Sequence, residues 1–316
     1  MPGNIQESTA MTQYLGQPLS ESITEHIGAT PLVRLNRLPA SFGIKAKVCA
    51  KLEYFNAGGS VKDRIAKRMV EQAEQDGLIK PGDTLIEASS GNTGIAIALM
   101  AAIKGYKCII TLSEKMSLEK EQILHALGAR VINTSSRKIP RAHELGPAEE
   151  IWHQTQGKVN AVVAGAGTGG TITGMARAFK KKNRGVFVVG VDPVGSVLAQ
   201  PAALNGKKSE YKIEGIGYDF VPGVLDQAAP DLWVKTTDKE SFQMARQLVS
   251  QEGILCGGSS GAAFAGLRQF LEIHPEFNVE DKTIVLVLAD NLRNYLTKFG
   301  DDAWMESNGY GLDLTP

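Results

Sequence analysis

The stretch AVVAGAGTGGT (Ala161–Thr171) runs from a strand-like apolar segment into a glycine-rich turn, and a helix-like segment follows it as far as Lys182. Glycines between a strand and a helix mark the position where open α/β sheets bind ligands. Two further glycine-rich stretches are SSGNTG (Ser89–Gly94), which follows a strand-like run, and GGSSG (Gly257–Gly261), which precedes an apolar helix. Backbone N–H groups at a helix start bind anions, and glycine lets an anion approach closely. Three such loops predict a ligand with more than one anionic or polar end.

Strand-like and helix-like segments alternate along most of the chain. The expected strands cover residues 47–52, 84–88, 106–112, 130–133, 159–164, 186–191 and 283–288. The expected helices cover about 61–75, 92–104, a segment that ends at Gly128, a segment that ends at Lys182, 239–252 and 261–271. Strands that alternate with helices of this length predict right-handed βαβ units, and hence an α/β fold with mostly parallel sheets.

The length of the chain predicts two lobes. It has 316 residues, and a domain typically has about 150. The alternating pattern breaks between Thr134 and Ile151, and we interpret this break as the lobe boundary. We therefore expect a larger lobe formed by residues 1–48 and 155–316, and a smaller, substrate-gripping lobe formed by residues 49–154.

The composition excludes several classes of protein. Lys and Arg number 34, and so do Asp and Glu, so the net charge is zero and no long-range field attracts nucleic acid or anionic lipid. No apolar run reaches the ~18 residues that span a bilayer, and residues 1–17 lack the pattern of a secretory signal. Cys49, Cys108 and Cys256 are unclustered, which favours buried free thiols over a metal site. We expect a cytoplasmic protein with no nucleic-acid, membrane or metal partner.

One glycine loop also fits a different class of enzyme. Gly165, Gly167 and Gly170 have the spacing of the dinucleotide fingerprint, and Asp192 follows about 20 residues later at the end of the next strand. This arrangement suits the ribose of NAD and suggests a dehydrogenase. It leaves the other two glycine loops unexplained.

A lysine stands at the start of a predicted helix, in NAGGSVKDR (Asn56–Arg64). A helix start is an unfavourable place for an ammonium group because the helix dipole is positive there. One interpretation is a surface lysine, Lys62, that pairs with Asp63. The other is a lysine held as a neutral amine or imine, which is what a Schiff-base lysine needs.

Together these motifs resemble the β-family (fold-type II) of pyridoxal-phosphate enzymes, and within it the cysteine synthase/cystathionine β-synthase family. The resemblance covers residues 23–305 as one catalytic core. It rests on IGATPLV (27–33), NAGGSVKDR (56–64), SGNTG (90–94) and GTGGT (167–171). GVDPVGSVLA (190–199), EGIGYDFVP (214–222) and RNYLTKF (293–299) are similar to the eukaryotic cystathionine synthases in particular. The fold implied is that of the tryptophan synthase β-subunit, with two open, mostly parallel twisted sheets flanked by helices.

The resemblance implies pyridoxal 5′-phosphate as the cofactor and assigns residues to it. Lys62 is the catalytic lysine, which forms the Schiff base and later moves the α-proton. Asn92 hydrogen-bonds the ring hydroxyl, and Ser259 faces the pyridine nitrogen. A hydroxyl there leaves that nitrogen largely unprotonated, which suits β-elimination better than transamination. The phosphate is held by backbone N–H groups of Gly167, Thr168, Gly169, Gly170 and Thr171.

The resemblance also implies a substrate site and a reaction. Ser89, Ser90 and Thr93 hold the substrate carboxylate at a helix start, and Gly217 and Tyr218 line the mouth of the site. The reaction is a β-replacement in which L-serine loses its α-proton and its hydroxyl and a thiol then adds. With homocysteine as the thiol, the product is cystathionine.

The smaller lobe departs from the family pattern. Between Thr134 and the stretch 140–151 the family normally has a helix and another strand, and here only residues 135–139 intervene. The lobe is therefore expected to lack roughly 30 residues, about one βα unit. That unit contains the family's Gln-Tyr pair, which grips the substrate carboxylate. Ala289–Asn291 also alters the LPDS-like stretch after the last core strand.

Two alternatives remain open beside cystathionine formation. One is a cysteine synthase-like or sulfide-handling β-replacement, and the other is a catalytically impaired protein that binds pyridoxal phosphate and acts through partner contacts. The expected partners are a small amino acid and a thiol, and the expected assembly is a homodimer. Vertebrate-type relatives carry an N-terminal haem segment and a C-terminal regulatory pair of domains, and we expect neither, and no haem.

Overall fold

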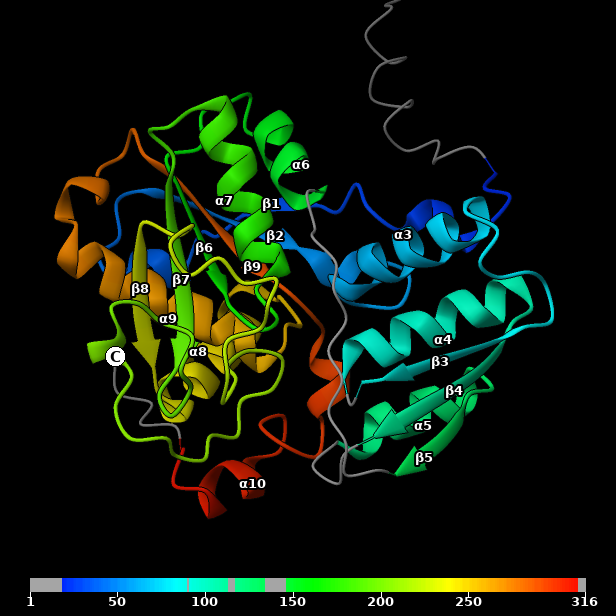
Figure 1. The fold of residues 1–316 in the computed structure, drawn as a ribbon. Helices are drawn as coiled ribbons and strands as arrows, with labels where there is room; N and C mark the ends of the chain where they lie inside the picture. Colours follow the sequence, from blue (N-terminus) through cyan, green and yellow to red (C-terminus); the bar gives the residue numbers. More distant parts are fainter. Residues whose placement is uncertain (1–18, 90, 113–116, 134–145, 312–316) are drawn as a thin grey trace, which may run out of the picture.

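Two sheets organise the chain in the computed structural model, which describes residues 19–89, 91–112, 117–133 and 146–311 (Figure 1). The larger sheet has the order β1-β2-β9-β6-β7-β8, and only β1 is antiparallel to its neighbour. Its strands are β1 (Leu32–Arg34), β2 (Lys47–Leu52), β6 (Ala161–Gly165), β7 (Phe187–Pro193), β8 (Leu232–Thr236) and β9 (Thr283–Leu288). The smaller sheet is parallel and consists of β3 (Thr84–Ala88), β4 (Lys107–Leu112) and β5 (Arg130–Asn133).

Helices cover both faces of the larger sheet because its strands alternate in the direction of their apolar side chains. Val163 packs in one core with α8 (Asp238–Glu252) and α9 (Gly258–Ile273). Its neighbour Val162 packs in a second core with α7 (Gly170–Lys182). A third core lies in the smaller lobe between its sheet and its helices, which are α3 (Lys62–Gln75), α4 (Asn92–Lys104) and α5 (Leu118–Ala126). The remaining helices are α2 (Leu38–Ser41), α6 (Gly146–Gln154) and α10 (Asp302–Ser307). The predicted fold class is thereby confirmed.

The lobe boundary lies elsewhere than the sequence pattern predicted. Residues 49–52 belong to β2, which pairs with β9 in the larger sheet, although the prediction placed them in the smaller lobe. Helix α6 also belongs to the larger lobe, because Ala148 and Ile151 are fully buried in the core beside α7. The described part of the smaller lobe therefore contains fewer residues than predicted, and its sheet has three strands. The predicted junction at 135–139 lies outside the described residues.

Two other predictions can be compared with the described residues. Cys49, Cys108 and Cys256 are all free and buried, and burial raises the pKa of each thiol. In the described part of the chain no helix has the length and apolar character needed to cross a membrane.

Candidate active site

The segment that follows β9 joins the starts of three helices. Asp290 forms a β-bridge with Ser60, two residues before the first residue of α3, Lys62. Its backbone carbonyl accepts a hydrogen bond from the N–H of Gly257, at the start of α9, at 2.9 Å. Its carboxylate accepts a hydrogen bond at 2.7 Å from Nδ2 of Asn92, the first residue of α4. The predicted cofactor residues on three separate helices therefore lie around one short loop, which Figure 1 shows between the larger lobe and α4.

Lys62 is partly buried, and its side chain forms no ion pair with any described residue. Its neighbour Asp63 points elsewhere: it is 1% exposed, and its Oδ2 accepts the N–H of Gly58 at 2.7 Å. Burial raises the pKa of Asp63 to about 6, although hydrogen bonds from the backbone of residues 58–60 oppose this. The interpretation of Lys62 as a surface lysine paired with Asp63 is therefore wrong.

Helices α4, α7 and α9 each begin after a glycine, and none of the three starts has a side-chain cap. By contrast, α8 and α10 begin directly after Thr237 and Asp301, whose side chains accept hydrogen bonds from the first turn. An uncapped helix start keeps N–H groups that no carbonyl of the helix can accept. These three starts are consequently suited to the anionic and polar groups of a ligand.

Two positions of the loop before α7, Gly167 and Gly169, leave no room for a side chain. Gly169 has φ +89°, and a Cβ there would lie 2.4 Å from the Cβ of Leu225. A Cβ on Gly167 would lie 2.4 Å from the carbonyl oxygen of Gly215. The loop is thus pressed against residues 215–225, and the first turn of α7 follows it directly. This glycine-lined cradle fits a phosphate group.

The other predicted cofactor residue, Ser259, is the second residue of α9 and is 6% exposed. The carboxyl ends of β6 and β9 are neighbours in the parallel sheet, so the loop after β6 and the Asp290 loop after β9 share one edge. Ligands of open α/β sheets bind at this edge. The structure therefore brings Lys62, Asn92, Ser259 and the glycine cradle to one place.

The predicted substrate residues fall into two groups. Ser89 precedes α4, with its Oγ 3.5 Å from the N–H of Gly91, and Thr93 is the second residue of that helix. Ser90 lies outside the described residues. The second group is next to the glycine cradle, because the N–H of Gly217 donates to the carbonyl of Ala166 at 2.8 Å.

Tyr218 continues that second group. Its N–H donates to Oγ of Ser196 at 2.9 Å, and its ring contacts Phe220 with the centroids 5.3 Å apart. Gly217, with φ +79°, turns the chain just before it. The backbone of this turn is therefore fixed on both sides, by Ala166 and by Ser196.

Sequence analysis missed the residues that hold Asn92. The Oδ2 atom of Asp290 accepts the Tyr295 hydroxyl at 2.5 Å as well as Asn92, and Nδ2 of Asn294 donates to Oδ1 of Asn92 at 3.1 Å. We call Asp290, Asn92, Asn294 and Tyr295 the Asp290 cluster. Burial raises the pKa of Asp290, and the charge of Lys120 only partly offsets this. The available signal was an aspartate at the end of the apolar run TIVLVL, with two cluster members inside RNYLTKF.

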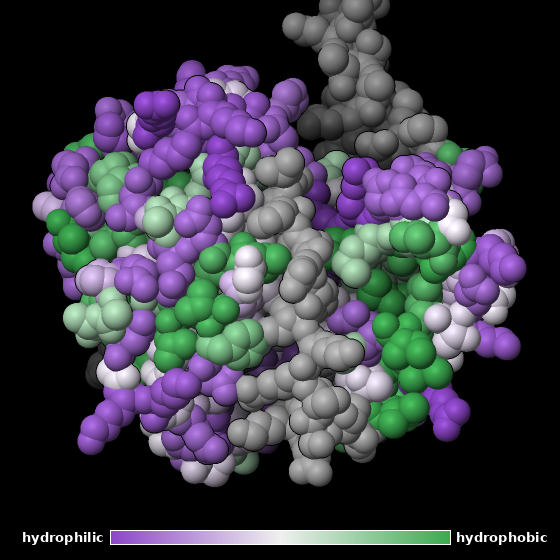
Figure 2. All heavy atoms as spheres, viewed as in Figure 1, coloured by the Kyte–Doolittle hydropathy of each residue, from purple (hydrophilic) through white to green (hydrophobic). Residues whose placement is uncertain are grey.

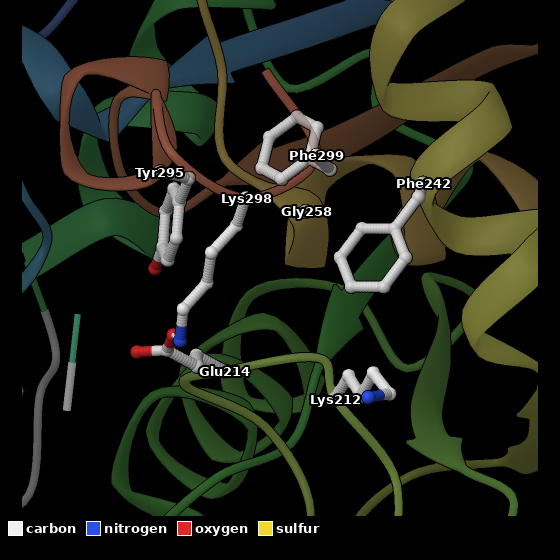
Figure 3. A pocket seen from close by; sticks show the side chains of 7 residues that line it. All are labelled: Lys212, Glu214, Phe242, Gly258, Tyr295, Lys298 and Phe299. Carbon is white, nitrogen blue, oxygen red and sulfur yellow. Dashed lines mark hydrogen bonds and ion pairs between the residues drawn. The ribbon is translucent and has the colours of Figure 1, made fainter. Parts of the chain in front are cut away.

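A small pocket lies beside this cluster, and Tyr295 and Glu214 are among the residues that line it (Figure 3). Glu214, in the larger lobe, accepts hydrogen bonds at 2.5 Å from Lys298 and from Lys120, which belongs to α5 of the smaller lobe. Figure 3 shows the Lys298 ammonium beside the Glu214 carboxylate, with the rings of Phe242 and Phe299 on the apolar side of the pocket. Sequence analysis gave no role to this link.

Asp192, the aspartate of the dinucleotide fingerprint, has its hydrogen-bond partners within the chain itself. Asp192 is fully buried, and its Oδ2 accepts the N–H groups of Leu198 and Ala199 at 3.1 Å each. The same oxygen pairs with Lys235 at 2.7 Å. This carboxylate fixes the following loop, so it is not presented to a ribose.

A lysine, a glycine cradle and a buried hydroxyl at the carboxyl edge of a parallel sheet together define a pyridoxal-phosphate enzyme. The family described as "Pyridoxal-phosphate dependent enzyme" matches residues 23–147 and 146–290, and the chain belongs to this family. The predicted cofactor and enzyme class are thereby confirmed, and the dehydrogenase interpretation is wrong.

Curated relatives support the same family. The chain is 49% identical to a cystathionine beta-synthase of Dictyostelium discoideum over 324 residues, covering 92% of this chain and 64% of the relative. It is 45% identical to that of Oryctolagus cuniculus, covering 95% of this chain and 62% of the relative. The chain thus spans less than two thirds of these relatives. The alignment with the Dictyostelium protein spans more positions than the 316 residues of this chain, so the relative has residues that this chain lacks.

Solved structures share the fold. A hydrogen sulfide-producing enzyme from Fusobacterium nucleatum aligns with a TM-score of 0.78 at 34% identity, covering 88% of this chain and 100% of that one. O-ureido-L-serine synthase aligns with a TM-score of 0.80 at 32% identity, covering 94% of this chain and 98% of that one.

Proposed function

We propose that the protein catalyses a pyridoxal-phosphate-dependent β-replacement in which L-serine and homocysteine give cystathionine. The observation that carries this proposal is the meeting of Lys62, Asn92, Ser259 and the glycine cradle at one edge of the larger sheet. The curated relatives are cystathionine beta-synthases, which favours homocysteine as the thiol. When bound, the cofactor supplies an electron-withdrawing ring that stabilises negative charge at the substrate's α-carbon.

Each cofactor residue has a role that its environment supports. Lys62, at the start of α3, attaches the cofactor and then moves the α-proton. Asn92 donates a hydrogen bond to the ring hydroxyl. Ser259 faces the ring nitrogen, and its neutral hydroxyl leaves that nitrogen largely unprotonated. The phosphate is held by the backbone of Gly167–Thr171 at the start of α7, where the dipole favours an anion.

The substrate residues have roles of the same kind. Ser89, Ser90 and Thr93 hold the substrate carboxylate at the uncapped start of α4. Gly217 and Tyr218 line the mouth of the site, where their turn adjoins the glycine cradle. We further propose residues 23–305 as the catalytic core and a homodimer as the assembly.

Two other functions remain candidates. A sulfide-handling β-replacement is favoured by the structural similarity to a hydrogen sulfide-producing enzyme. A catalytically impaired protein that binds the cofactor and acts through partner contacts is favoured by the predicted deletion in the smaller lobe, which would remove a pair of residues that grips the substrate.

Absorption spectroscopy separates these proposals. We expect the purified protein to show the visible band of lysine-bound pyridoxal phosphate, and we expect Lys62→Ala to lose it. A wild-type protein without that band, or a variant that keeps it, would contradict the cofactor assignment. L-Serine should then change the spectrum, and turnover with homocysteine should exceed turnover with sulfide. A band that does not respond to serine favours the impaired protein, and faster turnover with sulfide favours the second candidate.

A further inference from the structure

The Asp290 carboxyl group is buried, and the nearby charge of Lys120 compensates for this only in part. It is 2% exposed, and in the described part of the chain no ion pair reaches it. Its Oδ2 accepts hydrogen bonds from Asn92 and Tyr295, while its Oδ1 has no partner among the described residues. A buried polar oxygen without a partner costs stability, so such an atom needs an explanation other than folding.

The backbone around this carboxyl group is built to admit it. A Cβ on Gly257 would lie 1.9 Å from Oδ1 of Asp290, so only glycine leaves room for that oxygen. Gly257 immediately precedes α9, and the positive end of the helix dipole favours a negative charge there. The chain thus accommodates a carboxylate at the junction of α4 and α9, although this carboxylate accepts only two hydrogen bonds from residues that the structure describes.

The carboxylate determines which way the Asn92 amide points. An ionised carboxylate can only accept hydrogen bonds, so the Asn92 atom that faces it must be the nitrogen. Asn294 donates to the amide oxygen from the other side, which fixes the same orientation. An amide nitrogen carries two N–H groups, and Asp290 takes one of them. The second remains to donate to a ligand.

We propose that Asp290 is a positioning residue that orients the Asn92 amide, so that its second N–H donates to the ring hydroxyl oxygen of pyridoxal phosphate. This inference rests on the proposed function, which places Asn92 at that hydroxyl. Asp290 itself touches neither cofactor nor substrate in this arrangement. Without it, the amide can turn its oxygen toward the ring and the donor is lost.

A double-mutant cycle on cofactor binding tests the proposal. The affinity of the apoprotein for pyridoxal phosphate is measured by titration for wild type, Asn92→Ala, Asp290→Leu and the double variant. We expect each single substitution to weaken binding roughly tenfold to a hundredfold. The double variant should bind about as weakly as the weaker single variant, because Asp290 acts through Asn92. Losses that multiply would overturn the proposal, as would wild-type affinity in Asp290→Leu.

The absorption spectrum gives a readout that a purely structural role does not change. The ratio of the two cofactor bands depends on the protonation of the ring hydroxyl, so Asp290→Leu should shift it in the same direction as Asn92→Ala. Asp290→Asn keeps an acceptor oxygen and should give an intermediate ratio. If Asp290→Leu does not fold, the cycle is measured with Asp290→Asn. This substitution must weaken cofactor binding in the wild-type protein and must have no further effect on binding in the Asn92→Ala variant. An unchanged ratio in the Asp290 variants contradicts the proposal.

A matched control separates general destabilisation from positioning. Asp231 accepts hydrogen bonds from Lys180 and from the N–H of Val188 at 2.8 Å each, at the opposite edge of the larger sheet. Asp231→Asn should lower stability and leave cofactor affinity and the band ratio unchanged. Absence of the Lys62-dependent band in wild type would instead contradict the proposed function. Unaltered binding in Asn92→Ala would overturn this inference, because Asp290 is proposed to act through Asn92, and would leave the rest of the proposed function in place.

Discussion

Two buried clusters of polar side chains adjoin α3, and they are built in opposite ways. One is the Asp290 cluster. The other lies where the segment around Thr30, strand β2 and helix α6 meet α3. We call it the paired cluster, and it consists of Lys51, Glu53, Arg64 and Glu150.

Every carboxylate oxygen of the paired cluster has a partner. Arg64 binds Glu53 at 2.7 Å and Glu150 at 2.6 Å, and Lys51 binds Glu150 at 2.6 Å. The hydroxyl of Thr30 donates to the remaining oxygen of Glu53 at 2.8 Å. Burial alone would raise the pKa of Glu150, but the hydrogen bonds from Arg64 and Lys51 outweigh it and lower the pKa to about 2.

The Asp290 cluster has the opposite balance. Its carboxyl group has one oxygen with two neutral donors and one oxygen with no described partner, and burial raises its pKa. Two cations and two carboxylates offset one another's burial in the paired cluster, whereas the single carboxylate of Asp290 is left partly uncompensated. The comparison suggests that the paired cluster holds the chain together and that the Asp290 cluster serves the site.

The largest expected effect is on the paired cluster. Arg64→Leu leaves the buried carboxylate of Glu53 without its cation and removes one of the two cations that pair with the partly buried Glu150. We therefore expect a loss of about 3–5 kcal/mol in the free energy of unfolding. Urea denaturation of the apoprotein measures it. The control is Lys104→Leu, which removes the partly exposed pair with Glu74 and should cost about 0.2–1 kcal/mol. Similar losses in the two variants would show that the paired cluster is no more stabilising than a surface pair.

The next effect is the pH dependence of the contribution that Glu150 makes to the free energy of unfolding. Its pKa is lowered from 4.5 to about 2, so its contribution to stability is present above pH 4.5 and is lost as the pH falls toward 2. Glu150→Gln removes this contribution. The difference in unfolding free energy between wild type and variant should therefore be largest near neutral pH and should shrink in acid, as urea titrations at several pH values can show. A constant difference would contradict the lowered pKa.

A glycine exchange tests the site without touching either cluster. Gly169→Ala places a methyl group against Leu225 at a positive φ, so the cradle must deform, and we expect weaker cofactor binding with a stability loss of about 1–2 kcal/mol. Gly253→Ala has a similar φ of +69° but open space around it, at the end of α8. It should cost about 1 kcal/mol without changing cofactor affinity. Equal cofactor affinity in both variants would contradict the cradle.

Local patterns predicted most of the fold. The strands at 47–52, 84–88 and 283–288 have the predicted bounds, because each is a short run bounded by clear turns. Strands β1 and β8 were not predicted. Strand β1 has only three residues. Strand β8 carries the charged residue Lys235, which pairs with Asp192 on the neighbouring strand β7, and this tertiary contact is not visible in the local pattern.

The site was predictable where its parts are contiguous in sequence. Lys62 and the glycine loops each lie within one motif, so a reader of the sequence can find them. Asp290 contacts Asn92 across 198 positions, and no local pattern encodes that contact. The predicted lobe boundary differs from the observed one for a related reason, since only the packed structure shows that Ile151 belongs to the core beside α7.

The smallest expected effect on stability is that of Asp290→Asn, and it distinguishes the two clusters most clearly. Asp290→Asn should change the unfolding free energy of the apoprotein by less than about 1 kcal/mol at neutral pH, because an amide oxygen can accept both hydrogen bonds and no charge is left buried. The raised pKa means that the contribution of Asp290 to wild-type stability falls as the pH rises above 3.8, and the variant should lack this contribution. Glu150 has the opposite slope. A loss as large as that of Arg64→Leu would show that Asp290 is structural after all, whereas a small loss with weakened cofactor binding separates the two clusters by function.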